Sequence, residues 1–150
     1  MIRAKVRDWI ERHDLLPWGG NVLAACSGGA DSLVLVDLLA EFQCEGEIRL
    51  FVAHFDHGLR GEASTRDAEF VRQFCAERNL PFFGGFADVR ETMRLTGGSL
   101  EEVARHLRYD YLHKVLGQIG GGLIATGHHK DDQAETVLLN LIRGSGGRGL

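Results

Sequence analysis

The chain has 150 residues, of which 44% are hydrophobic and 25% are charged, a composition that excludes a disordered segment and fits one soluble globular domain. A chain of this length buries roughly 68–70% of its unfolded surface, so its core needs no disulfide support. Lysine and arginine number 17 and aspartate and glutamate 21, which gives a formal net charge of −4. That balance argues against strong nucleic-acid binding by this chain alone, since phosphate contacts need clustered positive charge.

Neither membrane insertion nor secretion is indicated. The longest apolar stretches, such as residues 33–36, are far shorter than the roughly 18 residues of a membrane span, and residues 1–8 lack the apolar region of a signal peptide. Three widely separated cysteines, Cys26, Cys44 and Cys75, outline neither a disulfide framework nor a zinc site. We therefore predict a cytoplasmic protein with reduced thiols.

Short apolar runs alternate with helical patterns along the chain. The runs have the length of buried strands, and glycine, proline or polar turns bound them. We predict strands over residues 21–26, 50–53, 81–83 and 123–126. After each run, apolar residues recur at three- and four-residue steps, as in helices that pack one face against a sheet. We predict helices over residues 31–42, 64–79, 100–115 and 131–143.

Capping patterns mark two of the expected helix starts. Ser99 and Glu102 form a capping box, and Ser64 with Asp67 forms a variant of one. The strand and helix order predicts an α/β fold: a Rossmann-like, doubly wound parallel sheet with helices on both faces. Ligands of such sheets bind at the carboxyl ends of the strands, so we look for chemistry in the strand-to-helix loops.

The loop after the first strand reads Ser-Gly-Gly-Ala-Asp-Ser and predicts a phosphate site. Gly28 and Gly29 let backbone N–H groups turn inward, and the next helix presents its positive end. Ser27 and Ser32 add hydroxyl groups. Asp31 would repel phosphates unless a cation lay between them, and Mg²⁺ commonly takes that place. The structural alternative is an ordinary tight turn.

The loop after the second strand, residues 54–62, is dense in polar side chains. His57 and Arg60 could approach phosphate or RNA, and the flanking glycines imply a shaped segment. A solvated loop is the structural alternative.

The loop after the fourth strand, residues 127–136, carries an acidic cluster formed by Asp131, Asp132 and Glu135. Such a cluster can hold a second Mg²⁺, bind an ammonium group or act as a general base. The structural alternative, Asp131 as a helix N-cap, accounts for one of these carboxylates only.

Several motifs in a fixed order carry a family resemblance. The glycine loop resembles the signature of the PP-loop (N-type) ATP pyrophosphatases, which belong to the adenine nucleotide alpha hydrolase-like folds. Further motifs lie at residues 56–62, 107–109, 128–136 and 143–150. Together they are similar to one branch of that superfamily, the bacterial tRNA(Ile)-lysidine synthetases, from about residue 20 to the end.

The resemblance implies an ATP-dependent ligase that forms a carbon–nitrogen bond. Enzymes of this family use ATP and Mg²⁺ to adenylate the wobble cytidine of a minor isoleucine tRNA with a CAU anticodon. Free lysine then attacks, which gives lysidine, AMP and pyrophosphate. We expect residues 1–150 to form the N-terminal PP-loop catalytic domain, shortened at its C-terminal end and without the tRNA-contacting domains. Such a piece should bind ATP but act weakly on tRNA. The oligomeric state stays open, with a homodimer as one alternative.

The same resemblance implies roles for individual residues. ATP would be bound by Ser27, Gly28, Gly29, Ala30, Asp31 and Ser32, with Ala25 and His54 at the adenine and Asp31 also on Mg²⁺. Catalysis would fall to Arg108, which reaches the α-phosphate or the target base. It would also involve Asp132, which handles the lysine ammonium or the metal, and His128, the next candidate to remove the ammonium proton. Substrate binding would involve Asp56, His57, Arg60 and Glu135. For Arg108, a plain surface arginine is the structural alternative.

Two other functions remain open from the sequence. A tRNA 2-thiolation enzyme would share the glycine loop, but paired cysteines are its usual sulfur carriers and no C-x-x-C occurs here. A non-catalytic nucleotide-binding sensor of the same fold would bind ATP and turn nothing over.

Overall fold

The computed structural model describes residues 2–59, 61–128 and 138–143. Its helices are α1 (Ile2–Arg12), α2 (Ala30–Cys44), α3 (Glu62–Glu77), α4 (Val89–Thr96) and α5 (Leu100–Gln118). Its strands are β1 (Asn21–Ala25), β2 (Arg49–Asp56), β3 (Phe82–Phe86), β4 (Leu123–His128) and β5 (Leu138–Arg143).

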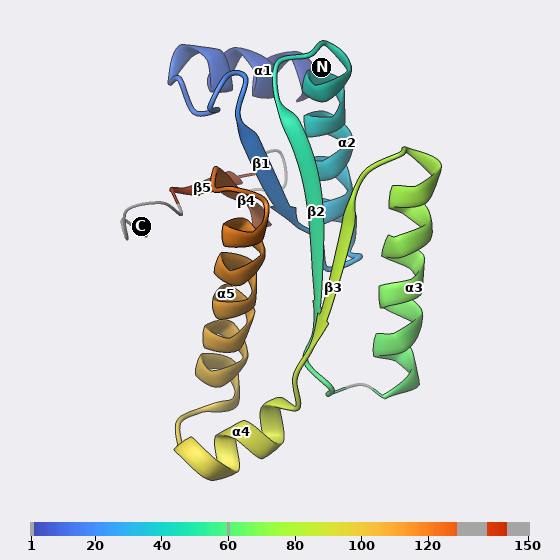
Figure 1. Ribbon diagram of the computed structural model, residues 1–150, viewed down its shortest axis with the longest axis vertical. Helices are drawn as coiled ribbons and strands as arrows, with labels where there is room; N and C mark the ends of the chain where they lie inside the picture. Colours follow the sequence, from blue (N-terminus) through green and yellow to red (C-terminus); the bar gives the residue numbers. More distant parts are fainter. Residues whose placement is uncertain (1, 60, 129–137, 144–150) are drawn as a thin grey trace.

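The strands form a single sheet in the order β3-β2-β1-β4-β5 (Figure 1). The first four of these pair in parallel, and β5 runs antiparallel to β4. Because β1 lies inside the sheet and later strands add on both sides of it, the sheet is doubly wound. The predicted α/β class and the four parallel strands are therefore confirmed.

Helices cover both faces of the sheet, as predicted. On one face, Val22 and Ala24 of β1 belong to a core that α1, α2 and α3 complete; on the other, Leu23 packs with Leu112 and Leu116 of α5 (Figure 1). Alternate residues of a strand point to opposite faces, so β1 is buried on both sides. This explains why it reads as a continuous apolar run.

One of the two predicted helix caps is confirmed and the other is wrong. The Ser99 hydroxyl accepts the Glu102 N–H at 3.1 Å, and the Glu102 carboxylate accepts the Ser99 N–H at 3.1 Å, which completes the capping box of α5. Helix α3 begins at Glu62, two residues before Ser64, after a Gly61 N-cap with a φ of 58° and no side-chain cap. Glycine adopts that backbone conformation readily, so the turn itself sets the start of the helix.

The predicted helix over residues 131–143 is wrong for its second half. Residues 138–143 form β5, whose backbone pairs along the whole of β4, from Leu123 opposite Arg143 to His128 opposite Leu138. The pairing covers the outer edge of β4, which would otherwise expose unpaired N–H and C=O groups. A short apolar run does not distinguish a helix from a strand by periodicity. Residues 131–137 lie outside the described part of the chain.

Helices α1 and α4 were not predicted. In α1, Val6 and Ile10 lie one turn apart and both pack on the core. In α4, Asp88 is the N-cap and accepts the Glu91 N–H at 3.1 Å. Across the residues that the structure describes, no helix is both long and apolar enough to cross a membrane.

Candidate functional site

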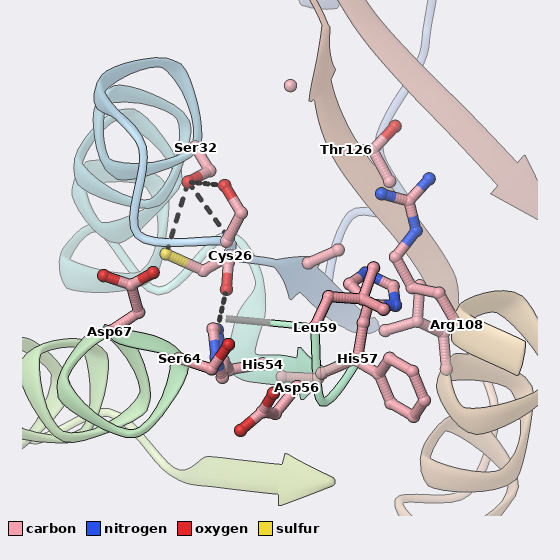
Figure 2. A pocket seen from close by; sticks show the side chains of 16 residues that line it. Cys26, Ser32, His54, Asp56, His57, Leu59, Ser64, Asp67, Arg108 and Thr126 are labelled. Carbon is pink, nitrogen blue, oxygen red and sulfur yellow. Dashed lines mark hydrogen bonds between the residues drawn. The ribbon is translucent and has the colours of Figure 1, made fainter. Parts of the chain in front are cut away.

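A cavity of about 330 Å³ opens at the carboxyl edge of the parallel sheet (Figure 2). Ala25 of β1 lies opposite Ala53 of β2 on one side and Thr126 of β4 on the other, and all three residues line the cavity. Side chains from α2, α3 and α5 complete the walls. The cavity thus lies at the sheet edge where doubly wound folds bind ligands, and its volume suits a small molecule.

The loop between β1 and α2 is organised around the Ser32 hydroxyl. Its oxygen accepts the backbone N–H groups of Ser27 (3.1 Å) and Gly28 (3.3 Å), and the hydroxyl donates to the Gly29 carbonyl oxygen (3.0 Å). The Ser27 hydroxyl in turn accepts the Gly29 N–H at 3.2 Å. Three successive loop N–H groups therefore donate to hydroxyl oxygens within the turn and fix its shape.

Two glycines allow this loop to lie close to its neighbours. Gly28 has a φ of +96°, which L side chains rarely adopt. At Gly127, after Thr126, an added Cβ would lie 3.2 Å from the Asp31 carbonyl oxygen. The end of β4 therefore packs against the first turn of α2, next to the glycine loop.

The end of β2 supplies His54 and Asp56 to the cavity, and His57 follows directly after the strand. The Nδ1–H of the buried His54 donates to the Cys26 carbonyl oxygen at 2.9 Å, which ties β2 to the start of the glycine loop. The Asp56 carboxylate accepts the Gly58 N–H at 2.8 Å and so stabilises the turn after the strand. Two of the three side chains are thus engaged with backbone groups.

Three buried polar atoms in the cavity wall have no hydrogen-bond partner among the described residues: His57 Nδ1, Arg108 Nε and Thr126 Oγ1. Buried polar groups are nearly always paired, so these atoms point to a ligand. Burial lowers the pKa of His57, and the nearby positive charge of Arg108 lowers it further, against an opposing effect of Asp56. Burial and the charge of Arg108 therefore both favour the neutral imidazole of His57.

The opposite wall contains two residues of α3 without a predicted binding role, Ser64 and Asp67. Asp67 lies beside the glycine loop, since a Cβ added to Gly28 would be 3.9 Å from the Asp67 Cβ. Both residues share a helix face with the buried Val71 and Cys75, at three- and four-residue steps. Polar residues at the start of an otherwise buried stripe are the sequence signal that could have identified them.

The structure brings many of the predicted site residues together. Those that line the cavity are Ala25, Ser27, Ser32, His54, Asp56, His57 and Arg108. Gly28, Gly29, Ala30 and Asp31 form the adjoining loop and first turn of α2 without lining the cavity. The backbone of His128 ends β4. Arg60, Asp132 and Glu135 lie outside the described residues, and so does the side chain of His128.

The chain is similar to known proteins over nearly its whole length. Residues 6–150 match the family model of the PP-loop domain, ATP_bind_3. The tRNA(Ile)-lysidine synthase of Caldanaerobacter subterraneus is 38% identical over 146 residues, which cover 97% of this chain and 31% of the relative. The enzyme of the same name from Symbiobacterium thermophilum is 43% identical over 97% of this chain and 30% of the relative. The one from Chlorobaculum tepidum is 44% identical, with 94% and 43% covered. The chain thus spans less than half the length of each relative.

Solved structures show a similar arrangement. The U34-tRNA thiolase NcsA from Methanococcus maripaludis, solved with its 4Fe–4S cluster, gives a TM-score of 0.74 at 26% identity over 89% of this chain and 46% of that one. The glutamine-dependent NAD⁺ synthetase from Acinetobacter baumannii, solved with ADP, gives a TM-score of 0.54 at 16% identity. The match covers 82% of this chain and 23% of the synthetase chain. The second likeness concerns the fold alone.

Proposed function

Because this chain belongs to the PP-loop domain family, we propose that it is the ATP-binding catalytic part of a cytoplasmic tRNA(Ile)-lysidine synthase. One observation carries the proposal: the Ser-Gly-Gly-x-Asp-Ser loop, whose shape the Ser27 and Ser32 hydroxyls fix, leads into α2 beside a ligand-sized cavity at the carboxyl edge of the sheet. The positive end of α2 favours a polyphosphate. The nucleoside would then lie over the ends of β1 and β2, near Ala25 and His54.

The residues present fit a magnesium ion. Mg²⁺ prefers carboxylate oxygens and substrate phosphates, and usually takes one or two protein carboxylates. Asp31 lies in the first turn of α2, and Asp67 lines the cavity next to Gly28. We assign Asp31 to the metal, with Asp67 as the second carboxylate within the described residues. When bound, the ion would neutralise charge on the polyphosphate.

The proposed reaction has two displacements. The C2 oxygen of cytidine attacks the α-phosphorus of ATP, and the bond to the β-phosphate breaks to release pyrophosphate. The ε-amine of lysine, after losing a proton, attacks C2, and the C2–O bond breaks to release AMP. Arg108 in the cavity wall would stabilise negative charge at the α-phosphate. Asp132 or His128 would accept the ammonium proton of lysine. The substrates would be bound by Asp56, His57, Arg60 and Glu135.

The cysteines favour lysidine synthesis over thiolation. Iron–sulfur clusters are held by several cysteine thiolates together. Here Cys26 and Cys75 are buried, whereas Cys44 is exposed at the far end of α2. A helix of 15 residues spans about 22 Å, so these three thiols do not converge. Within the described ranges, no group of three or more His, Cys, Asp and Glu residues is arranged to hold a metal ion.

The test measures binding and transfer separately. We expect the purified chain to bind ATP in the presence of Mg²⁺. A chimera that carries this chain in place of the matching segment of the Symbiobacterium thermophilum enzyme should move labelled lysine into unmodified tRNA(Ile) and release AMP. A folded chimera that binds ATP but transfers no lysine would overturn the proposal and favour a sensor; sulfur transfer to tRNA would favour a thiolase.

A further inference from the structure

We infer that the Thr126 hydroxyl is a ligand-binding group that contacts the α-phosphoryl oxygens of the bound nucleotide, an inference that rests on the proposed function. Thr126 is only 4% exposed, and its Oγ1 has no hydrogen-bond partner within the part of the chain that the structure describes. An unpaired buried hydroxyl destabilises a folded protein. Its partner is therefore expected to arrive with a ligand.

Thr126 shares its side of the sheet with α5. Its neighbour two residues before, Ile124, packs with Leu112 of that helix, and alternate strand residues face the same way. Figure 2 shows Thr126, Arg108 and His57 along one wall of the cavity, across from Ser32 and Asp67. The Thr126 hydroxyl therefore lies in the same wall as the two other buried atoms without a partner.

The chemistry of these atoms selects an anionic oxygen. Arginine Nε–H is always a donor, so the missing partner of Arg108 must be an acceptor. The Asp56 carboxylate accepts the Gly58 N–H, and burial and the charge of Arg108 favour the neutral form of His57. Arg108 is therefore the cation of this wall among the described lining residues. A hydroxyl and a guanidinium together suit a phosphoryl oxygen.

The register identifies which phosphate is involved. Thr126 pairs with Ala25, two residues before the glycine loop begins at Ser27, and the next residue, Gly127, packs against the first turn of α2. The hydroxyl thus lies beside the point where β1 passes into the glycine loop. The proposed function places the β- and γ-phosphates at that loop and the nucleoside over the ends of β1 and β2. The α-phosphoryl group joins these two parts of ATP.

The test compares Thr126→Val, which keeps the shape and removes the hydroxyl, with Thr126→Ser, which keeps the hydroxyl. Titration calorimetry with ATP, AMP and pyrophosphate would measure binding to the chain, and thermal unfolding would measure its stability. For the valine variant we expect an unchanged or raised Tm without ligand, AMP and ATP affinities lower by about tenfold, and unchanged pyrophosphate affinity. The serine variant should bind all three ligands within about twofold of the original chain.

Each other outcome has a defined meaning. A lower Tm with parallel losses for all three ligands would show a structural role and overturn the inference. Unchanged ATP and AMP affinities in the valine variant would overturn the inference as well. If these affinities are unchanged and only tRNA-dependent AMP release is lost, the hydroxyl contacts the target base instead of the nucleotide. If the original chain binds neither ATP nor AMP, both the proposed function and the inference about Thr126 are wrong.

Discussion

Ser32 lies beneath Ser27, with its hydroxyl oxygen 3.1 Å from the Ser27 backbone nitrogen and its side chain almost entirely buried. The same oxygen accepts the Gly28 N–H, and the hydroxyl donates to the Gly29 carbonyl oxygen. These bonds lie within the loop, so we assign Ser32 a positioning role. It fixes the shape of the turn beside which the phosphates would bind.

The Ser32→Ala variant should therefore lose both stability and ATP affinity. Removing the acceptor leaves two backbone donors without a partner, which costs about 1–3 kcal/mol in the free energy of unfolding. We expect ATP affinity to fall by about tenfold, because the loop is no longer held in its shape. Urea unfolding and titration calorimetry measure the two effects. Native affinity in this variant would show that the loop keeps its shape without Ser32.

Asp67 provides a test of the metal assignment. If Asp67 is the second carboxylate, Asp67→Asn should raise the Mg²⁺ concentration needed for half-maximal ATP binding while metal-free ATP binding stays the same or improves, since a repulsive charge is removed. Glu69→Gln is the matched control, because Glu69 lies on the exposed side of the same helix. Equal Mg²⁺ dependence in both variants would remove Asp67 from the metal site.

The parallel sheet could be predicted because a strand that is buried on both faces is a continuous apolar run in the sequence. The glycine loop could be predicted from its own residues. The residues of β1 are apolar on both sides, and the loop that follows has the glycines its turn requires. The capping box at Ser99 and Glu102 is likewise a local pattern with a local cause.

Features that depend on tertiary contacts could not be predicted. Residues 138–143 pair with β4 because that edge is available, and their own periodicity does not reveal it. The hydroxyl of Thr126 looks like any strand threonine until its burial and missing partner are seen. The helical spacing of Ser64 and Asp67 puts them on one face with Val71 and Cys75, but only the tertiary packing brings that face next to the glycine loop.

Thiol reactivity should distinguish the three cysteines. Burial raises the pKa of Cys26, and burial together with the nearby Cys26 raises the pKa of Cys75 to about 11. The thiolate is the reactive form, so at pH 8 we expect a disulfide reagent to label Cys44 rapidly and the other two only after unfolding. Cys44→Ser should abolish the rapid phase. Rapid labelling of Cys75 in the native protein would contradict this account.

Two glycines, Gly85 beside α5 and Gly117 within it, differ in the space that is available for an added methyl group. A Cβ added to Gly85 would lie 2.5 Å from the Tyr111 ring, whereas one added to Gly117 meets nothing within 4 Å. Gly85→Ala should therefore lower the free energy of unfolding by about 1–3 kcal/mol through overpacking. Gly117→Ala, in the last turn of α5, should raise it by about 0.5–1 kcal/mol through helix propensity. Similar urea midpoints for the two variants would contradict the packing at Gly85.

The His57 environment predicts how stability changes with pH. The pKa of His57 lies below its ordinary value of 6.5, because burial and the charge of Arg108 disfavour the imidazolium. Below 6.5 the unfolded chain therefore binds a proton that the folded chain takes up only at lower pH. The contribution of His57 to the free energy of unfolding is fully present above pH 6.5. It decreases as the pH falls from 6.5 through the lower pKa of His57 in the folded chain.

Urea unfolding at pH 7.5 and 5.5 measures this effect. We expect the original chain to lose more stability between these two pH values than His57→Gln, whose side chain stays neutral throughout. His113→Gln, at an exposed position on α5, is the control and should lose as much stability as the original chain. An equal loss in the original chain and in His57→Gln would show that the cavity accommodates a charged His57 without cost. Arg108 would then lie too far from the ring to repel it.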